Sequence, residues 1–396
     1  MNVLIVHNYY KIRGGEDVVF ENEVEALKKK SGVNVFSYSV NNQETDGGFF
    51  HKIAFLWKIL SGNRKVGSEI LENIKNKKID IVHFHNVFPL ITPFIYRFLR
   101  KHSNVKIVQT IHNFRFVCPS GLLFHNGKIC KTCLEKGNFR ACISSKCYRE
   151  SRLFSILYSY LIKKCSKSLR TDIDCYLTLN NFAKSILLQA GFPNTKIKIR
   201  GNSLQDVDQT ERVDGQYYLF IGRISQEKGL ENAVKAFIHL PGCDFVIAGT
   251  GPLLEELQGK YKDYRNIKFV GFCDGEKKKD LFLHAKAVII PSIWYENFPM
   301  VTVEAFRYGI PVISNAWGAI DGIVTHNVNA LLTGTESDTN DVRTENILQS
   351  VKKFEADKTL GGKLGDNARL TFLEKMEAEK SIEDLINIYK ELKNDS

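Results

Sequence analysis

Residues 287–314 have the sequence AVIIPSIWYENFPMVTVEAFRYGIPVIS, in which two short apolar runs enclose a polar loop and a helical segment. The first run, Ala287–Ile290, predicts a buried strand, and the second, Pro311–Ser314, predicts the next one. Between them, Pro299 suits the first position of a helix, because proline has no amide hydrogen to donate there. A strand, a loop, a helix and a further strand form the unit from which helix-covered parallel sheets are built.

The same alternation of strand and helix patterns covers nearly the whole chain of 396 residues. A polar, acidic stretch from Arg200 to Gln216 separates two blocks and predicts a linker. We therefore expect an α/β protein with two doubly wound, Rossmann-like domains, residues 1–200 and 201–372, whose ligands bind at the carboxyl ends of the strands, on either side of a cleft. The predicted strands are Asn2–His7, Val33–Ser39, Ile79–His83, Lys106–Thr110 and Cys175–Leu179, then Tyr217–Ile221, Phe245–Ala248, Ile267–Val270, Ala287–Ile290 and Pro311–Ser314.

The balance of charge differs between the two halves of the chain. Residues 1–200 carry 32 Lys and Arg against 14 Asp and Glu, whereas residues 201–396 carry 23 against 30. A basic half attracts polyanions such as nucleic acid, an acidic substrate or an anionic membrane surface, with general solubility as the alternative explanation. The longest nearly apolar run, Leu153–Ile162, is too short to span a bilayer. The first residues lack the basic start of a signal peptide, so we expect a cytoplasmic protein.

Glycines and cations follow several of the predicted strands. Gly14 and Gly15 precede the first helix, where backbone amides and the helix dipole favour a phosphate. In the second block, Arg223 and Lys228 flank a tight turn and suit a diphosphate, although two solvated surface cations would look the same. Gly251 lies in a further glycine turn that opens a helix. Because neither a complete dinucleotide fingerprint nor a P-loop lysine is present, hydride transfer and P-loop chemistry are disfavoured.

Two carboxylates stand eight residues apart in the opening stretch. Glu296 lies in the predicted loop and Glu304 one to two turns inside the predicted helix. Each is suited to bind a pair of neighbouring hydroxyls, such as a sugar or a ribose presents, while the helix N-terminus faces a phosphate. For Glu304, a surface acid on the helix is the alternative.

These motifs, in this order and spacing, resemble the retaining glycosyltransferases of the GT-B fold, specifically glycosyltransferase family 4. The resemblance is strong from about residue 217 to 335 and looser over the first 120 residues. The sequence departs from the family at Asn297 and Ala330, each of which replaces a glycine, and Asn297 bears on which sugar hydroxyl is recognised. The segments that carry it are Gly14-Gly15, Arg223 with Lys228, Glu296-Pro299-Glu304, EAFRYGIPVIS at 304–314 and NALL at 329–332.

The resemblance implies an enzyme that moves a hexose from a UDP- or GDP-sugar donor with retention of configuration and without a catalytic metal ion or other cofactor. It implies that Glu296 binds hydroxyls of the transferred sugar, with amides near Asn297 and Phe298, and that Glu304 binds the ribose. Arg223 and Lys228 would neutralise the departing diphosphate, a role that a metal ion fills in other transferases. Gly14, Gly15 and Gly251 are further donor-binding candidates.

His112, in the sequence QTIHN after a predicted strand, would contact the transferred sugar at the reaction centre. Without the resemblance, an ordinary loop histidine is the alternative. The resemblance also implies a C-terminal helix that crosses back to the first domain. A charged amphipathic pattern from Leu370 to Leu392 predicts one long helix there, with residues 373–396 packing on the N-terminal domain.

The acceptor implied by the resemblance is a lipid-linked oligosaccharide or a polysaccharide. Two segments, Ser151–Lys164 and Ile53–Leu60, combine apolar and aromatic residues with neighbouring cations and predict helices that lie on anionic lipid. Two core helices with basic ends are the alternative. With the positive N-terminal half, these segments predict peripheral association with the inner face of the plasma membrane.

Five cysteines fall between residues 118 and 147, in an insert that we expect to shape the acceptor pocket. Because disulfides are rare in the cytoplasm, four of these cysteines are candidates for a structural zinc site, with free thiols and a redox pair as alternatives. Cys142 is expected to be the spare thiol. The candidate ligands are Cys118, Cys130, Cys133 and Cys147.

Other functions remain open at this stage. A basic, zinc-containing nucleic-acid-binding protein fits the charge, but no nucleic-acid motif is legible, so no nucleic-acid partner is expected. A nucleotide-sugar epimerase or a phosphorylase would keep the fold and change the chemistry. Two Asp-x-Asp sequences, at 172–174 and 206–208, lie outside the positions that a metal-dependent transferase requires, and both are expected to be solvated turns.

Overall fold

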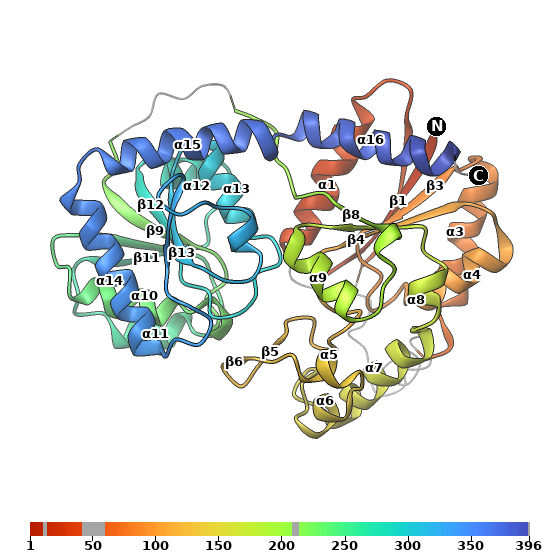
Figure 1. The fold of residues 1–396 in the computed structure, drawn as a ribbon, viewed down its shortest axis with the longest axis horizontal. Helices are drawn as coiled ribbons and strands as arrows, with labels where there is room; N and C mark the ends of the chain where they lie inside the picture. Colours follow the sequence, from red (N-terminus) through yellow and green to blue (C-terminus); the bar gives the residue numbers. More distant parts are fainter. Residues whose placement is uncertain (11–13, 42–59, 208–213, 395–396) are drawn as a thin grey trace. The chain divides into compact units, whose positions relative to one another are not determined.

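The computed structural model describes residues 1–10, 14–41, 60–207 and 214–394, and these residues form two compact units (Figure 1). Unit 1 comprises residues 1–123, 130–202 and 378–396, and unit 2 comprises residues 124–129 and 203–377. Each unit contains one six-stranded sheet in which every pair of neighbouring strands is parallel. The predicted pair of Rossmann-like α/β domains is confirmed.

In unit 1 the strand order is β2-β1-β3-β4-β7-β8, so the order reverses between β1 and β3. The elements are β1 (Asn2–Tyr9), α1 (Gly15–Lys28), β2 (Asn34–Asn41), α3 (Arg64–Asn76), β3 (Ile81–Phe84), α4 (Phe94–His102), β4 (Lys106–Ile111), α5 (Thr132–Lys136), α6 (Arg140–Ser144), α7 (Arg152–Cys165), α8 (Ser168–Thr171), β7 (Cys175–Thr178), α9 (Asn181–Gln189), η2 (Asn194–Lys196), β8 (Ile197–Ile199) and α16 (Ala378–Asn394).

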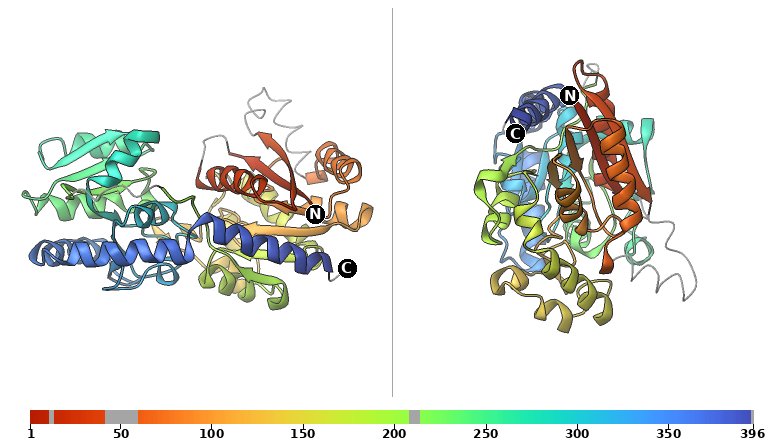
Figure 2. Two further views of the ribbon diagram at one scale, coloured as in Figure 1. Left: turned by 90° about the horizontal axis from the view of Figure 1, so that it is seen from above. Right: turned by 90° about the vertical axis from the view of Figure 1, so that its right-hand side faces the viewer.

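Both faces of this sheet are covered, as the continuous apolar run in β1 requires. Val3 and Ile5 on one face and Leu4 and Val6 on the other are all fully buried. The face that carries Val3 and Ile5 packs against α1 and α16, which also contact each other (Figures 1 and 2). Helix α16 therefore belongs to the core of unit 1, which agrees with the expected crossing of the C-terminal helix.

In unit 2 the strand order is β11-β10-β9-β12-β13-β14, with the reversal between β9 and β12. The elements are β9 (Tyr217–Ile221), η3 (Gln226–Lys228), α10 (Leu230–Ile238), β10 (Phe245–Ala248), α11 (Leu254–Lys260), β11 (Ile267–Gly271), α12 (Gly275–Leu283), β12 (Ala285–Ile290), α13 (Met300–Arg307), β13 (Val312–Asn315), η4 (Ile320–Gly322), β14 (Ala330–Thr333), α14 (Asn340–Ala356) and α15 (Leu360–Lys375), together with the antiparallel hairpin of β5 (Phe124–His125) and β6 (Lys128–Ile129).

The C-terminal segment differs from the single helix predicted for Leu370–Leu392. Helix α15 ends at Lys375 and α16 begins at Ala378. The carbonyl of Met376 accepts a hydrogen bond from the amide of Leu204, 3.0 Å away, instead of one from the next helical turn. This backbone partner ends α15 within unit 2, and the following residues belong to unit 1.

The expected domain limits, at residues 200 and 372, differ by a few residues from the limits of the units, which lie after Asn202 and after Glu377. The short strands β5, β6, β8 and β14 were not predicted. Segment Ile53–Leu60, apart from Leu60, falls outside the described residues. Among the helices that the structure describes, none is long and apolar enough to cross a membrane.

Candidate functional site

In each sheet the strand order reverses between two neighbouring strands, and the loops after these two strands diverge. Ligands of doubly wound folds bind in the crevice between those loops, at the carboxyl ends of the strands. In unit 2 these strands are β9 and β12, followed by loops 222–229 and 291–299. The two loops meet, since the amide of Ile293 donates to the carbonyl of Glu227 at 2.9 Å. Gly229 permits the contact, because with φ of +63° its missing side chain would lie 2.2 Å from the carbonyl oxygen of Pro291.

Loop 222–229 brings Lys228 to the carboxylate of Glu296. The Lys228 Nζ lies 2.6 Å from Oε1 of Glu296, and the Ser292 hydroxyl donates to the same oxygen at 2.6 Å. Glu296 is only 6% exposed. Burial alone would raise the pKa of Glu296, but Lys228 and Ser292 outweigh it and hold that pKa below its ordinary value. Glu296 is therefore a buried, ionised carboxylate, and Lys228 is its cation.

Glu304 lies on α13, which begins directly after Pro299 as predicted. Its carboxylate is paired with Lys278 of α12, with 2.6 Å between Nζ and Oε1, and its side chain is 20% exposed. Asn297 is buried and Phe298 is half-buried, and both lie in the loop between Glu296 and α13. Loop 291–299 and the start of α13 thus carry Glu296, Asn297, Phe298 and Glu304 at one edge of the sheet.

Arg223 and Gly251 lie in neighbouring loops at this edge. Arg223 is exposed, and within the part of the chain that the structure describes it forms no ion pair. Gly251 packs its backbone against that of Ile224, where a side chain would lie 2.2 Å from a carbonyl oxygen. Close packing between the loops after β9 and β10 therefore explains why residue 251 is a glycine. Arg223 remains available to a ligand.

In unit 1, one of the two glycines at the start of α1 has its backbone amide hydrogen-bonded within the chain. The Gly14 amide donates to Oδ2 of Asp17 at 2.7 Å, so this amide is not open to a phosphate. Gly15 is the first residue of α1 and is exposed. Asp17 is fully buried, and its other oxygen lies 2.7 Å from Nε2 of His7. Of the two predicted donor-binding glycines, the geometry leaves Gly15 accessible.

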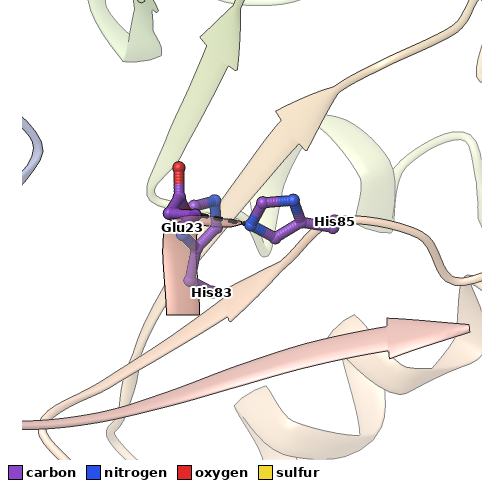
Figure 3. Close-up of side chains that lie close together, drawn as sticks. All are labelled: Glu23, His83 and His85. Atoms are coloured by element: carbon purple, nitrogen blue, oxygen red, sulfur yellow. Dashed lines mark hydrogen bonds and ion pairs between the residues drawn. The ribbon is translucent and has the colours of Figure 1, made fainter. Parts of the chain in front are cut away.

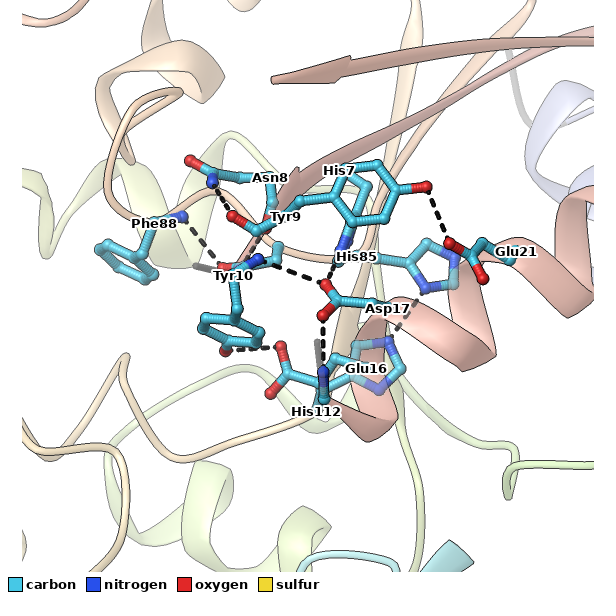
Figure 4. Close-up of polar contacts among 12 residues, drawn as sticks. His7, Asn8, Tyr9, Tyr10, Glu16, Asp17, Glu21, His85, Phe88 and His112 are labelled. Carbon is cyan, nitrogen blue, oxygen red and sulfur yellow. Dashed lines mark hydrogen bonds and ion pairs between the residues drawn. The ribbon is translucent and has the colours of Figure 1, made fainter. Parts of the chain in front are cut away.

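Four buried histidines gather at the carboxyl edge of the unit 1 sheet (Figures 3 and 4). Three strands bring them together, because side chains on one face of a strand recur every second residue. On the face covered by α1 and α16, β1 continues from Ile5 to His7, and β3 continues from Ile81 to His83 and beyond its end to His85. The fourth, His112, follows β4 directly.

His112 lies beside His85, with Nε2 of His112 3.0 Å from Nδ1 of His85 (Figure 4). Its side chain is 8% exposed. Burial, together with the neighbouring His85 and His7, holds the pKa of His112 well below its ordinary value, so the ring is neutral at pH 7. The predicted catalytic histidine is therefore placed at the functional edge of its sheet as an uncharged ring.

Behind these histidines, α1 contributes Glu23, whose carboxylate is buried (Figure 3). Its Oε1 lies 2.9 Å from Nε2 of His85 and 3.3 Å from Nδ1 of His83. Its Oε2 pairs with the guanidinium of Arg200. Burial works against the charge of Glu23, yet Arg200 and the histidines hold its pKa well below the ordinary value.

The Glu23, His83 and His85 side chains have their ligand atoms within 4.8 Å of one another, as a metal site would require. The polar atoms of this cluster already have partners within the protein, however. Arg200 neutralises Glu23, and Nδ1 of His83 lies 2.6 Å from the Tyr389 hydroxyl. A guanidinium on the only carboxylate opposes a divalent cation at the same place, so we interpret this cluster as a hydrogen-bonded network.

A second polar group surrounds Glu16 at the start of α1. Its carboxylate accepts hydrogen bonds from the Tyr10 hydroxyl and from Nδ2 of Asn113, both at 2.7 Å. The guanidinium of Arg115 lies over the Tyr10 ring, 5.3 Å from its centroid. This group connects the loop after β4, which carries His112 and Asn113, to the N-terminus of α1.

The cysteines of the insert approach one another. Cys133 interacts electrostatically with Cys118, Cys142 and Cys130, and burial raises the pKa of its thiol to about 12. Burial also raises the pKa of the Cys147 thiol to about 12, and the neighbouring Cys142 raises it further. Cys142, the expected spare, is buried within this group. Among the described residues, no three of these sulfur atoms lie within 4.8 Å of one another.

The two Asp-x-Asp sequences are not solvated turns throughout, and that prediction is wrong for the first. Asp172 is buried and accepts hydrogen bonds from Ser168 and Thr171. Asp174 pairs with Arg100 at 2.6 Å. The charges of these acids are used within the fold. In the second sequence, Asp206 pairs with Arg369, and Asp208 lies outside the described residues.

Sequence reasoning missed Glu23, His83 and His85. A signal for the histidines was present, because HFH at 83–85 ends a predicted strand, as His112 does, and parallel strands end at the same edge. For Glu23 the sequence offers no such signal. It stands in the charged run ENEVE, where an acid is typical of an exposed helix face.

Comparison with known proteins gives related findings. Residues 203–371 match the family model described as "Glycosyl transferases group 1". The chain is 24% identical over 323 residues to an uncharacterized glycosyltransferase of Methanocaldococcus jannaschii, covering 79% of this chain and 75% of that protein. It is 24% identical over 313 residues to the O-antigen chain mannosyltransferase C of Escherichia coli, covering 75% and 80%. The crystal structure of Anabaena HepE in complex with UDP and glucose matches with a TM-score of 0.67 and 13% identity, covering 98% and 99%, and shares the GT-B fold.

Replacing Lys228 should expose the cost of burying Glu296. In Lys228→Met we expect a loss of about 2–3 kcal/mol in the free energy of unfolding at pH 7, because a buried carboxylate loses its cation. The folded-state pKa of Glu296 lies below that of an unfolded glutamate, so the pair stabilises the fold above about pH 4.3 and is lost as the pH falls through the folded-state value. The difference between wild type and variant in urea unfolding should therefore shrink as the pH falls below about 4.3.

Lys286→Met is the matched control, because Lys286 pairs with Glu355 at the same 2.6 Å distance but with side chains 28% and 36% exposed. It should cost at most about 1 kcal/mol. Equal losses in the two variants would contradict a special role for the buried pair.

Proposed function

We propose that this chain, a group 1 glycosyltransferase with the GT-B fold, transfers a hexose from a nucleotide-diphosphate sugar, UDP- or GDP-linked, to a lipid-linked or polysaccharide acceptor in cell-surface glycan synthesis. The transfer retains the anomeric configuration and uses no catalytic metal ion. The similarity to an O-antigen chain mannosyltransferase supports the assignment to polysaccharide synthesis.

One observation carries the donor assignment. At the reversal point of the unit 2 sheet, within the residues that match the family model, a lysine and a buried glutamate face each other at 2.6 Å. A nucleotide-diphosphate sugar offers a partner for each, namely phosphate oxygens for Lys228 and sugar hydroxyls for Glu296. The complexes of Anabaena HepE, a structure of the same fold, contain UDP and glucose and support this class of donor.

In the proposed reaction, Lys228 and the exposed Arg223 neutralise charge on the departing diphosphate, which is the role that a metal ion fills elsewhere. Glu296 accepts hydrogen bonds from hydroxyls of the transferred sugar, with Asn297 and Phe298 contributing backbone amides. Glu304 binds the ribose diol after exchanging its contact with Lys278.

His112 is proposed to contact the transferred sugar. Because its pKa is held well below the ordinary value, the ring brings no positive charge to an oxocarbenium-like transition state. Retention then follows from attack on the same face of the sugar that the diphosphate leaves, with the departing phosphate as the base.

A nucleotide-sugar panel tests the donor assignment. In thermal unfolding with UDP-, GDP-, ADP- and CMP-sugars, one nucleotide series should stabilise the wild type by about 2.7 kcal/mol at a hundred times its dissociation constant. Glu304→Ala should remove most of this stabilisation, because the ribose loses its partner. Glu276→Ala, on an exposed position of α12, should keep it. Stabilisation by no member of the panel, or equal stabilisation of Glu304→Ala, would count against the proposal.

For the acceptor side, we propose that α7 rests on an anionic membrane surface, which places the enzyme at the inner face of the plasma membrane. Leu153, Ile156 and Tyr160 are 57%, 43% and 49% exposed and form an apolar stripe on its outer face. The opposite face is buried through Tyr158 and Leu161. Exposed cations flank the stripe at Arg152, Lys163, Lys164 and Lys167, as expected for a helix on anionic lipid.

Vesicle sedimentation tests this surface. The triple variant Leu153→Ser, Ile156→Ser and Tyr160→Ser should bind phosphatidylglycerol vesicles at low salt at least about tenfold more weakly than the wild type. The double variant Leu370→Ser and Leu373→Ser removes residues of α15 that are 54% and 42% exposed, and it should bind as the wild type does. If the wild type failed to bind anionic vesicles, or if both variants were equally weakened, α7 would not be the membrane surface.

We propose a structural zinc ion in the insert, held by thiolates from the cysteines at 118, 130, 133 and 147, with Cys142 as a further candidate because it interacts with Cys133 and Cys147. Zinc would have to draw these sulfur atoms closer together than they lie in the structure. The raised thiol pKa values mean that bound metal would have to displace the protons. Mass spectrometry should find about one zinc per chain, lost in Cys133→Ser and kept in Cys243→Ser, which alters a cysteine of unit 2. Zinc-free wild type would refute the site.

A further inference from the structure

A line of buried side chains in unit 1 ends at His112. It runs from Arg200 through the carboxylate of Glu23 and the ring of His85 to Nε2 of His112. We infer that Glu23 and His85 are positioning residues, which fix His112 in the tautomer with its proton on Nε2 and leave Nδ1 as a hydrogen-bond acceptor. This inference rests on the proposed function only where it concerns catalysis.

The direction of the hydrogen bonds starts at Glu23. Its carboxylate is buried, but one oxygen pairs with Arg200, whose Nε also donates to the Ser381 carbonyl of α16 at 3.0 Å. A carboxylate with this partner stays ionised and can only accept hydrogen bonds. Nε2 of His85, 2.9 Å from the other oxygen, must therefore carry a proton and donate it.

His85 transmits this direction to His112. Because Arg200 already balances the charge of Glu23, an additional proton on His85 would leave an uncompensated cation in the buried cluster. A neutral imidazole that donates from Nε2 has a bare Nδ1. Nδ1 of His85 therefore accepts, and Nε2 of His112, at 3.0 Å, is the donor.

What remains is the second nitrogen of His112. With a neutral ring that donates from Nε2, its Nδ1 has a lone pair. Nδ1 makes no hydrogen bond with any residue in the described part of the chain, and the side chain retains 8% exposure. In the proposed reaction this nitrogen accepts a hydrogen bond from a sugar hydroxyl and brings no charge to the transition state.

The tautomer is directly measurable in the whole protein labelled with 15N-histidine. Two-bond 1H–15N correlation spectra distinguish a protonated ring nitrogen from a bare one, and His112→Asn identifies the signals. In the wild type at pH 7, His112 should show a protonated Nε2 and a bare Nδ1. The opposite tautomer, a mixture or a doubly protonated ring would overturn the inference.

Glu23→Gln should reverse the tautomer. Its amide oxygen can still accept from Arg200, while its NH2 group faces Nε2 of His85 and donates to it. His85 must then carry its proton on Nδ1 and donate to His112, which shifts the His112 proton to Nδ1. Tyr389→Phe is the matched control, because it removes the hydroxyl 2.6 Å from His83 and leaves the Glu23–His85–His112 line intact. A reversal in both variants, or in neither, would contradict the mechanism.

A variant that does not fold leaves two tests. The wild-type tautomer alone decides whether the line has the inferred direction, and His85→Phe, which removes the acceptor, should give a mixture of tautomers at His112. In the enzyme assay, Glu23→Gln should lower kcat at least about tenfold with little change in the KM for the donor, since the ring is present but wrongly protonated. An inactive wild type with the inferred tautomer would refute the proposed function and leave the positioning role standing.

Discussion

Glu296 is removed from water at the point where the two halves of the unit 2 sheet diverge, and a carboxylate in that position is stable only with a cation and hydrogen-bond donors around it. Lys228 and Ser292 supply both. Lys228 follows β9 and Glu296 follows β12, so their contact fixes the spacing of the two loops that meet at the reversal point. The glycine turns on either side satisfy the same constraint, because Gly229 and Gly251 let backbones approach where no side chain fits.

Unit 1 also contains a buried carboxylate that requires a cation, supplied there by different residues. Glu23 is the buried carboxylate, and Arg200, which follows β8, is its cation. The arginine also donates to the carbonyl of Ser381 and so connects α1, the edge of the sheet and α16. The C-terminal helix is thus part of the polar network behind the histidines as well as of the apolar core. This explains why the fold returns the end of the chain to this unit.

Much of this arrangement follows from the sequence. The apolar run Ala287–Ile290 and the helix after Pro299 are readable because strand and helix periods differ and proline marks a helix start. Parallel strands then oblige Lys228 and Glu296 to share an edge. Glu23 was not predictable, because an acid within a charged helix looks solvated until the partner strands are known, and Arg200, its cation, is 177 residues away.

The break between α15 and α16 was not predictable from the sequence either. The apolar pattern from Phe372 to Leu385 continues without a proline or glycine, so the sequence predicts one helix. The interruption comes from a backbone partner, the amide of Leu204, which is remote in sequence. Local patterns therefore determined the elements, whereas the polar groups that end or orient them depend on tertiary contacts.

Within the proposed function, the Lys228–Glu296 pair also relates phosphate binding to sugar recognition. A diphosphate that draws Lys228 away leaves Glu296 buried without its cation, which costs more than the new contact returns unless another donor replaces the lysine. The hydroxyls of the transferred sugar are such donors. A nucleotide diphosphate without its sugar offers hydroxyls only on the ribose, which the proposal assigns to Glu304, so the ion pair that stabilises the empty loops also discriminates in favour of the intact donor. The same buried charge that holds the two loops together thereby makes the sugar a condition for tight binding of the phosphates.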